Sequence, residues 1–359
     1  MKKTIIALAV LAASAASGVA SAQSTVTLYG LADVYVGTAA TKQSPNVGAS
    51  TSLRETVINS GGFNGSRFGL KGSEDLGGGL KANFVLEGGY DISTGAANNY
   101  ISPYNFTGPA TARTGVTSNA TFGRNTWVGL SSGFGEIRLG NMWTPYDEVK
   151  GSGAGAFDAN IFAPANSVWV SNGYQANPGN AIYLSTPTIS GFSAAGMVSF
   201  GENKTATINA GGIESMNVQF ASGPVAVAFA YQIEKQGGGT ATQLNKVKFT
   251  QLNGSYNLGM VKLLAAYGNV KVVGAKTNEF QIGVDVPLGS VLTVSGGFAS
   301  SKTQFTTGGD TKRSGFGLAA KYDISKRTFL YTGLQLGKEK DASGEEKINA
   351  FAAGVQHKF

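Results

Sequence analysis

The chain has 359 residues, a formal net charge of +7 at pH 7 and no cysteine, so nothing in it can form a disulfide. Charged residues make up only 14% of the chain, against about 25% in a typical soluble domain, and 52 residues are glycine. After the first 22 residues, no apolar run reaches the roughly 18 positions that a transmembrane helix needs, which excludes a helical membrane protein.

The N-terminal 22 residues have the composition of a secretory signal peptide. Lys2 and Lys3 form a basic start, a short apolar run follows, and the sequence ASA at 20–22 is typical of a cleavage site. We therefore expect cleavage after Ala22 and a single mature domain over residues 23–359. Without the two lysines the chain has 26 basic and 21 acidic residues, a net charge of +5. In an exported protein this excess favours anionic solutes or lipid headgroups, rather than nucleic acid, as partners.

The rest of the chain alternates between apolar and polar residues and is rich in aromatic and β-branched side chains, a pattern typical of strands. Turns rich in glycine, asparagine, aspartate and serine separate these segments. The pattern predicts sixteen strands, near residues 24–38, 62–74, 79–92, 120–131, 135–143, 179–187, 191–201, 213–222, 224–234, 245–258, 260–271, 276–287, 289–302, 311–324, 327–339 and 346–359.

The predicted connections alternate between short turns and mostly longer loops, which indicates an antiparallel up-and-down barrel. One set consists of turns such as SGFG and PLGS, and the other includes segments such as 41–60, 93–119 and 144–178. Sixteen strands enclose a lumen wide enough for water. The sequence thus predicts an all-β, sixteen-stranded antiparallel transmembrane β-barrel. A large secreted β-sandwich or β-helix adhesin is the alternative, which the strand number, the alternating loops and the low charge disfavour.

Four stretches of this sequence resemble the Gram-negative general porin family. They are QSTVTLYGLADVYV from residue 23, SRFGLKGSEDLGGGLKANFVLEGGYDISTG from residue 66, GRNTWVGLSSGFGEIRLGNM from residue 123 and the terminal GVQHKF. The resemblance implies a sixteen-stranded outer-membrane porin of a Gram-negative bacterium, which forms a water-filled channel for passive diffusion of small hydrophilic solutes and ions.

The resemblance also implies features that the residues alone do not. The third extracellular loop would fold into the barrel and narrow it. Three copies would assemble into a homotrimer, latched by the second loop at about 93–119. The terminal Phe359 would be the insertion signal that the barrel assembly machinery recognises, and an ordinary strand end is the alternative interpretation of this residue.

The stretch SRFGLK shows how free energy assigns the two faces of a strand. Arg67 and Lys71 lie on one face, and Phe68 and Leu70 lie on the other. A lysine or arginine at the lipid midplane costs about 2–4 kcal/mol, so we expect the two cations to face the lumen and the apolar pair to face lipid. The same argument sends Glu136 and Arg138 inward.

The complete set of predicted inward bases comes from neighbouring strands and forms a basic wall at the pore constriction: Arg67, Lys71, Lys81, Arg124 and Arg138. For Arg124 the alternation places Asn125, Trp127 and Gly129 on the opposite, outward face. One or two of these bases, Lys81 first among them, could instead pair with acids such as Asp33, Glu87 or Asp91 and serve stability alone.

The long connection 144–178 carries three acids, Asp147, Glu148 and Asp158, with Lys150 as its single base. Its aromatic residues Tyr146, Phe157, Phe162 and Trp169 favour an ordered loop packed against the barrel wall. Bases on the wall and acids on the loop would create a transverse field at the constriction, and charges arranged in this way set ion preference. The larger number of wall bases predicts a mild preference for anions.

Catalysis and metal binding find little support in the sequence. His357 is the only histidine and there is no cysteine, so neither a Ser–His–Asp arrangement nor a cluster of metal ligands is expected. We expect no enzyme activity and no cofactor. Two alternatives remain. One is a solute-specific porin for organic anions or sugars, with Tyr29, Tyr35, Tyr146 and Trp169 as candidates for an aromatic ladder along the lumen. The other is a structural or adhesive barrel. The basic residues Lys235, Lys302, Lys312, Arg313, Lys338 and Lys340 near the loops are expected to contact lipopolysaccharide or solvent.

Overall fold

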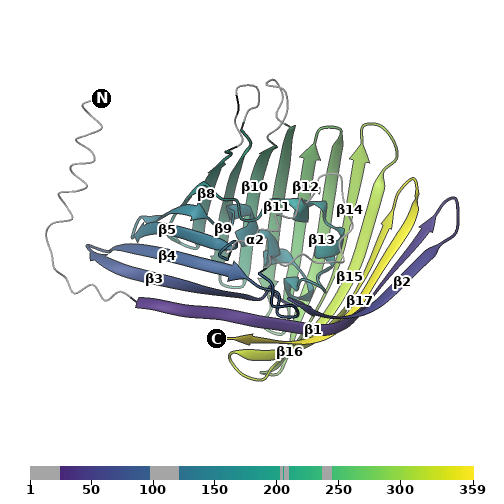
Figure 1. Cartoon of the computed structure of the whole chain (residues 1–359), viewed down its shortest axis with the longest axis horizontal. Coiled ribbons are helices and arrows are strands. Elements are labelled where there is room, and N and C mark those ends of the chain that lie inside the picture. The colour runs from purple at the N-terminus through teal and green to yellow at the C-terminus, as the bar shows by residue number, and fades with distance from the viewer. Residues whose placement is uncertain (1–24, 98–120, 203–204, 206–209, 237–244) are drawn as a thin grey trace.

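The computed structural model describes residues 25–97, 121–202, 205, 210–236 and 245–359 of the chain (Figure 1). The predicted signal peptide, residues 1–22, lies outside this part, as does most of the predicted latch at 93–119. Strands dominate the described residues, and the helical segments are short and gathered in one connection. No helix in these ranges is both long enough and apolar enough to cross a membrane.

Within the described ranges, the strands follow one another along the chain, and helical turns interrupt them once. They are β1 Thr25–Pro45, β2 Thr51–Ser60, β3 Arg67–Gly77, β4 Leu80–Gly89, β5 Asn125–Ser132, β6 Gly135–Asn141, β7 Ala181–Ser185, β8 Phe192–Phe200, β9 Gly212–Ser222, β10 Val225–Gln236, β11 Asn245–Asn257, β12 Lys262–Val272, β13 Ala275–Leu288, β14 Leu292–Phe305, β15 Thr311–Asp323, β16 Thr328–Lys340 and β17 Gly344–Lys358. The helical turns between β6 and β7 are α2 Pro145–Lys150, η2 Gly151–Gly153, η3 Ala156–Asp158, α3 Pro164–Val168 and η4 Val170–Gly173.

The strands close into an antiparallel barrel with sixteen positions. From β3 to β17 each strand pairs with the next, and β17 closes the barrel on β1, with Leu31 opposite Lys358 and Pro45 opposite Gly344. On its other edge β1 pairs with β3 over residues 25–31 and with β2 over residues 34–43. Strands β2 and β3 therefore share one position, and the predicted sixteen-stranded barrel is confirmed.

The predicted loop over 41–60 is wrong, because β1 continues to Pro45 and β2 returns along it as a hairpin. The predicted second strand is also shorter than expected and begins at Arg67 rather than near residue 62. Residues 61–66 interrupt the strand instead, and Gly61 adopts a positive φ of 76° there. We call residues 61–66 the β2–β3 junction.

The carboxylate of Asp33, fully buried on β1, holds the β2–β3 junction in place. It accepts hydrogen bonds from the backbone nitrogens of Phe63 (3.2 Å) and Asn64 (3.0 Å) and from the Tyr331 hydroxyl (2.6 Å). The Ser66 hydroxyl donates to the Asp33 carbonyl at 3.1 Å. These bonds satisfy backbone groups that left the strand ladder, so the interruption is stable inside the barrel.

Residues 142–180, which we call the inner loop, lie inside the ring of strands, as Figure 1 shows for α2. Polar side chains of the wall bond to the loop's backbone carbonyls: Asn217 donates to Pro145 at 2.7 Å, and Asn253 donates to Val149 at 2.7 Å. Tyr146, Phe162 and Trp169 are buried, and Phe157 packs against the cluster that contains Phe162 and Trp169. The predicted ordered, inward-folded third loop is confirmed, and the buried apolar residues form three clusters between this loop and the surrounding strands.

The outer surface of the barrel is apolar, as the alternation predicts. Phe68 is exposed on β3, while Arg67 on its other side reaches the inward-facing Glu87. Ile137 and Leu139 are exposed in the same way on β6. The chain therefore presents apolar side chains to lipid and polar side chains to the lumen, which is the arrangement of an outer-membrane barrel.

Candidate functional site

Arg67 and Arg124 lie on either side of a single carboxylate, that of Glu87 on β4. The Arg124 Nε lies 3.0 Å from Glu87 Oε1, and the Arg67 Nε lies 3.7 Å from Oε2. The Tyr29 hydroxyl donates to Oε2 at 3.1 Å, and the guanidinium of Arg124 lies 5.0 Å from the ring centre of Trp143. Two guanidinium groups share one carboxylate, so this cluster retains one positive charge.

Among the predicted partners of Lys81, Glu87 instead pairs with Arg67 and Arg124. The prediction that Lys81 is the base most engaged in pairing is therefore not supported at this acid.

The face predicted for the residues after Arg124 is wrong. Val128 is 59% exposed on the outside, whereas Trp127 packs inside against Met142 and Tyr183. Arg124 precedes the first residue of β5, so strand alternation does not govern it, and it reaches the lumen through the connection before the strand.

Arg138 on β6 forms a second cluster on the same wall. Its guanidinium group donates to Glu136 at 2.6 Å and lies between two aromatic rings, 4.7 Å from the centres of Trp127 and Tyr183. The Tyr183 hydroxyl donates to Glu148 of the inner loop at 2.8 Å. The wall and the loop acid are thus connected through one tyrosine. Alternation predicts the face of Arg138. Its stacking partners come from other strands, so they could be identified only from the folded structure.

Of the two lysines of the predicted basic wall, Lys81 lies apart from these arginine clusters, whereas Lys71 contacts Tyr29, which donates a hydrogen bond to Glu87. Lys71 is exposed and its Nζ lies 5.2 Å from the ring centre of Tyr29. Lys81 pairs in register with Asp75 close to the turn after β3, while Arg67 pairs in register with Gly89. Eight residues of β4, or about 26 Å, separate those two levels. The five bases therefore extend along the height of the wall rather than form one ring.

The three predicted loop acids lie on the inner loop. Asp147 accepts a hydrogen bond from the Tyr174 hydroxyl, and Glu148 accepts one from Asn217 at 3.1 Å in addition to that from Tyr183. Asp158 lies against Gly151. Partial burial raises the pKa of Asp147 and of Asp158 above the ordinary value, and the nearby charge of Lys150 opposes that rise. The loop therefore holds its negative charge less firmly than exposed carboxylates would.

The aromatic residues proposed for a solute ladder do not form one. Tyr35, Tyr146 and Trp169 are buried in the packing between the inner loop and the wall, and only Tyr29 of these four lies with the charged groups.

Three of the bases expected near the loops form ion pairs. Arg313, expected near the surface, is 4% exposed and pairs with Glu339, while Lys302 pairs with Asp310 and Lys338 pairs with Glu345. Within the described residues, no group of three or more potential ligands could hold a metal ion.

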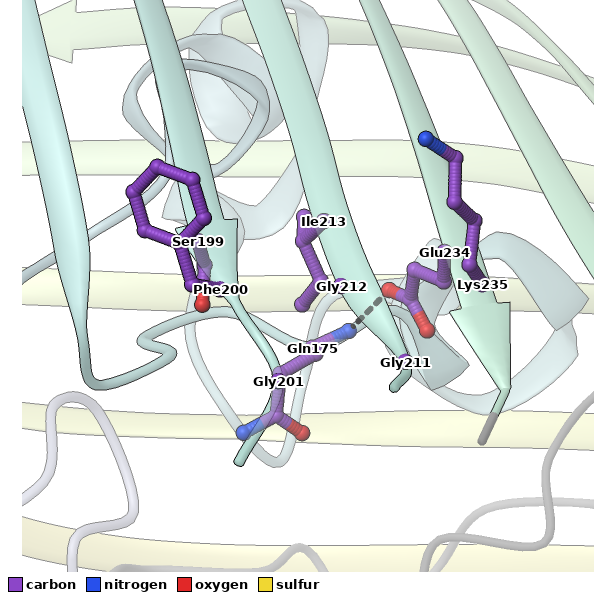
Figure 2. A pocket seen from close by; sticks show the side chains of 9 residues that line it. All are labelled: Gln175, Ser199, Phe200, Gly201, Gly211, Gly212, Ile213, Glu234 and Lys235. Atoms are coloured by element: carbon purple, nitrogen blue, oxygen red, sulfur yellow. Dashed lines mark hydrogen bonds between the residues drawn. The ribbon is translucent and has the colours of Figure 1, made fainter. Parts of the chain in front are cut away.

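A hollow of about 260 Å³ lies where the inner loop returns to the wall, and Figure 2 shows the side chains that line it. The backbone nitrogen of Gln175 donates to Glu234 at 2.5 Å, and the neighbouring Lys235 pairs with Glu214. The hollow contains none of the predicted site residues. Its hydrogen bond fastens the end of the inner loop to β10, so this region positions the loop.

Comparison with known proteins agrees with this architecture. A family model described as Gram-negative porin matches residues 7–342. Outer membrane porin protein 32 of Delftia acidovorans is 34% identical over an alignment that covers 99% of this chain and 95% of that protein. An outer membrane porin protein of Bordetella pertussis is 28% identical, with both chains covered in full. The solved anion-selective porin from Comamonas acidovorans is similar with a TM-score of 0.73 and 27% identity, over 94% of this chain and 100% of that one. The chain therefore belongs to the Gram-negative porin family.

Proposed function

We propose that this outer-membrane porin, a channel for passive diffusion of small hydrophilic solutes and ions, has a mild preference for anions. The proposal rests on the cluster in which Arg67 and Arg124 share Glu87, because this cluster leaves one positive charge on the lumen wall. Arg138, Lys71 and Lys81 add to that charge, and Glu136 offsets one of them. The similarity to a porin whose solved structure is described as anion-selective supports the same sign.

The test is the reversal potential of single channels in a planar bilayer under a KCl gradient. We expect the wild type to favour chloride, and the double variant Arg67→Ala/Arg124→Ala to shift severalfold toward potassium, because it leaves Glu87 unpaired on the wall. Lys338→Ala/Lys347→Ala is the matched control, since it removes two bases that pair with Glu345 at the start of β17. A cation-selective wild type, or a double variant that matches this control, would refute the anion preference.

We further propose that the protein is a channel and not an enzyme, that it assembles as a homotrimer, and that Phe359 is read by the barrel assembly machinery. The terminal residue pairs through its backbone nitrogen and oxygen with Gly30, at 3.1 Å each, while its ring stays 46% exposed. An aromatic end held at the barrel seam supports the proposed signal role. Contact of the loop lysines with lipopolysaccharide remains a proposal of the same kind, as does cleavage after Ala22.

A further inference from the structure

A hollow of about 380 Å³ lies between the inner loop and a part of the wall that holds none of the arginine clusters. The loop contributes the segment from Gly151 to Phe157, and the wall contributes inward residues of β12, β13, β15, β16 and β17. The β2–β3 junction closes one side with Phe63 and Asn64. This volume is at the lower end of the range of about 300–1,000 Å³ found for small-molecule sites.

The hollow carries an excess of positive charge. Lys262, Lys321 and Lys358 line it, and Asp285 is the only acid among its lining residues. The Asp285 carboxylate accepts a hydrogen bond from the Ser295 hydroxyl at 2.6 Å, and Lys321 pairs with Asp323 at 3.0 Å. Within the part of the chain that the structure describes, Lys262 and Lys358 form no ion pair. Two ammonium groups are thus available to an anion that enters the lumen.

The other side of the hollow is aromatic. Phe157 in η3 of the inner loop and Phe329 on β16 both pack against Phe63, with ring centres 5.5 Å and 4.9 Å from that of Phe63. The Lys321 ammonium lies 5.4 Å from the ring centre of Phe329. Phe157 is partly exposed, and its backbone has a positive φ of 62°. This left-handed conformation costs free energy for a residue with a side chain.

One buried amide at the hollow lacks a partner. Gln356 is fully buried, and its Oε1 accepts a hydrogen bond from Asn64 at 2.8 Å. Its Nε2 donates to no acceptor among the described residues. An unpaired buried donor is costly, so this amide is suited to a ligand oxygen placed beside it.

We infer that this hollow binds small aromatic carboxylates as they pass through the channel. The carboxylate would contact Lys262 and Lys358, and the ring would pack on Phe157 and Phe329. A small inorganic anion would leave the aromatic side unused, and a neutral sugar would leave the lysines uncompensated. The inference rests on the proposed function, since the ligand reaches the site through the open lumen.

The experiment measures block of the chloride current in planar bilayers by three added probes: benzoate, acetate and benzyl alcohol. Benzoate is expected to reach half-block at a concentration roughly tenfold below that of acetate, because aromatic contacts add to the charge interaction. Benzyl alcohol, which has the ring without the charge, should block least. Equal block by benzoate and acetate would overturn the inference, because charge alone would then explain binding.

Two variants assign the block to the hollow. Lys262→Ala/Lys358→Ala should abolish the benzoate block, and Phe157→Leu should remove the advantage over acetate while leaving acetate unchanged. The control Lys338→Ala/Lys347→Ala loses the same charge outside the hollow and should retain the wild-type order. Benzoate block that persists in both test variants would overturn the site.

The outcome also separates this inference from the proposed function. A wild type that conducts chloride and ignores benzoate overturns the inference alone. A wild type without conductance overturns the proposed function, and calorimetric titration of the detergent-solubilised protein with benzoate then decides the site. If the double lysine variant does not fold, Phe157→Leu supplies the deciding comparison.

Discussion

Glu87 sets the net charge of the cluster that it forms with Arg67 and Arg124. Its side chain is 8% exposed and contacts two guanidinium groups and one tyrosine hydroxyl. Each charge-assisted bond is stronger than a neutral one, so the carboxylate both fixes the positions of Arg67 and Arg124 and cancels one of their charges. Removing the negative charge of Glu87 should therefore increase the preference for anions and decrease the stability of the protein.

Glu87→Gln should raise the preference for anions and lower stability. The variant loses one negative charge from the wall while the amide oxygen still accepts one hydrogen bond, so the chloride-to-potassium permeability ratio should rise. The unfolding free energy should fall by about 1–3 kcal/mol, since two half-buried guanidinium groups lose their shared partner. Reversal potentials and thermal unfolding in detergent measure the two effects.

The control for this variant is Glu345→Gln, which removes an acid at the start of β17 that pairs with Lys338 and Lys347. It should leave both quantities near the wild type. If Glu87→Gln matches this control in reversal potential, the arginine cluster does not set ion preference.

Sequence alternation predicts a side chain's face only where the residue belongs to a regular strand. Arg67 and Arg138 are on β3 and β6, and both point inward as predicted. Arg124 precedes β5, so the same rule gave the wrong face for Trp127 and its neighbours. The sharing of Glu87 could not be predicted either, because it depends on the register between β3 and β4 and on the path of the connection before β5.

The inner loop is held by a close glycine contact as well as by hydrogen bonds. Gly155 lies directly on the wall: a Cβ added to it would be 2.6 Å from the Gly296 oxygen and 2.8 Å from the Gly297 Cα. A Cβ at Gly283 would be 2.6 Å from the Gly155 Cα. The loop and strands β13 and β14 can meet this closely only because these positions have no side chain.

Gly155→Ala should push the inner loop away from β13 and β14 and into the lumen. Single-channel conductance should fall, and the unfolding free energy should drop by about 1–3 kcal/mol, as overpacking predicts. Conductance in a bilayer and thermal unfolding in detergent measure these changes. Gly133→Ala is the matched control, because a Cβ there meets nothing within 4 Å; equal conductance in the two variants would contradict the close-contact model.

The element that sequence analysis missed is β2, and the reason is physical. Its sequence, TSLRETVINS, has few apolar residues, so it lacks the alternation that marks the other strands. Its backbone pairs fully with β1 nonetheless, and the β2–β3 junction is satisfied by Asp33 from a strand 30 residues earlier. Long-range hydrogen bonds of this kind leave no local signal, whereas the inner loop was predictable from its length and its aromatic residues.

The outer surface of the barrel differs in one place, beside β2. Along most of the barrel each strand is paired on both edges, as lipid requires of backbone groups. Strand β2 pairs with β1 along one edge, and its other edge has no paired strand among the described residues. Ile58 on its outer face is 70% exposed, beside Val36 on β1. The proposed trimer would cover this side, because a second copy could shield both the edge and the apolar face.

Two isoleucines on the outer face, Ile58 and Ile282, differ in whether their strand is paired along both edges. Ile58→Asn on β2 should lower the temperature at which oligomers dissociate on a semi-native gel, because an amide would enter the proposed contact between copies. Ile282→Asn on β13, where the isoleucine is 49% exposed on a strand paired along both edges, should leave that temperature unchanged. Both variants lose one apolar side chain, so a general loss of barrel stability would affect them alike. Equal dissociation temperatures for the two variants, or a wild type that migrates as a monomer before heating, would place lipid rather than a second copy against β2.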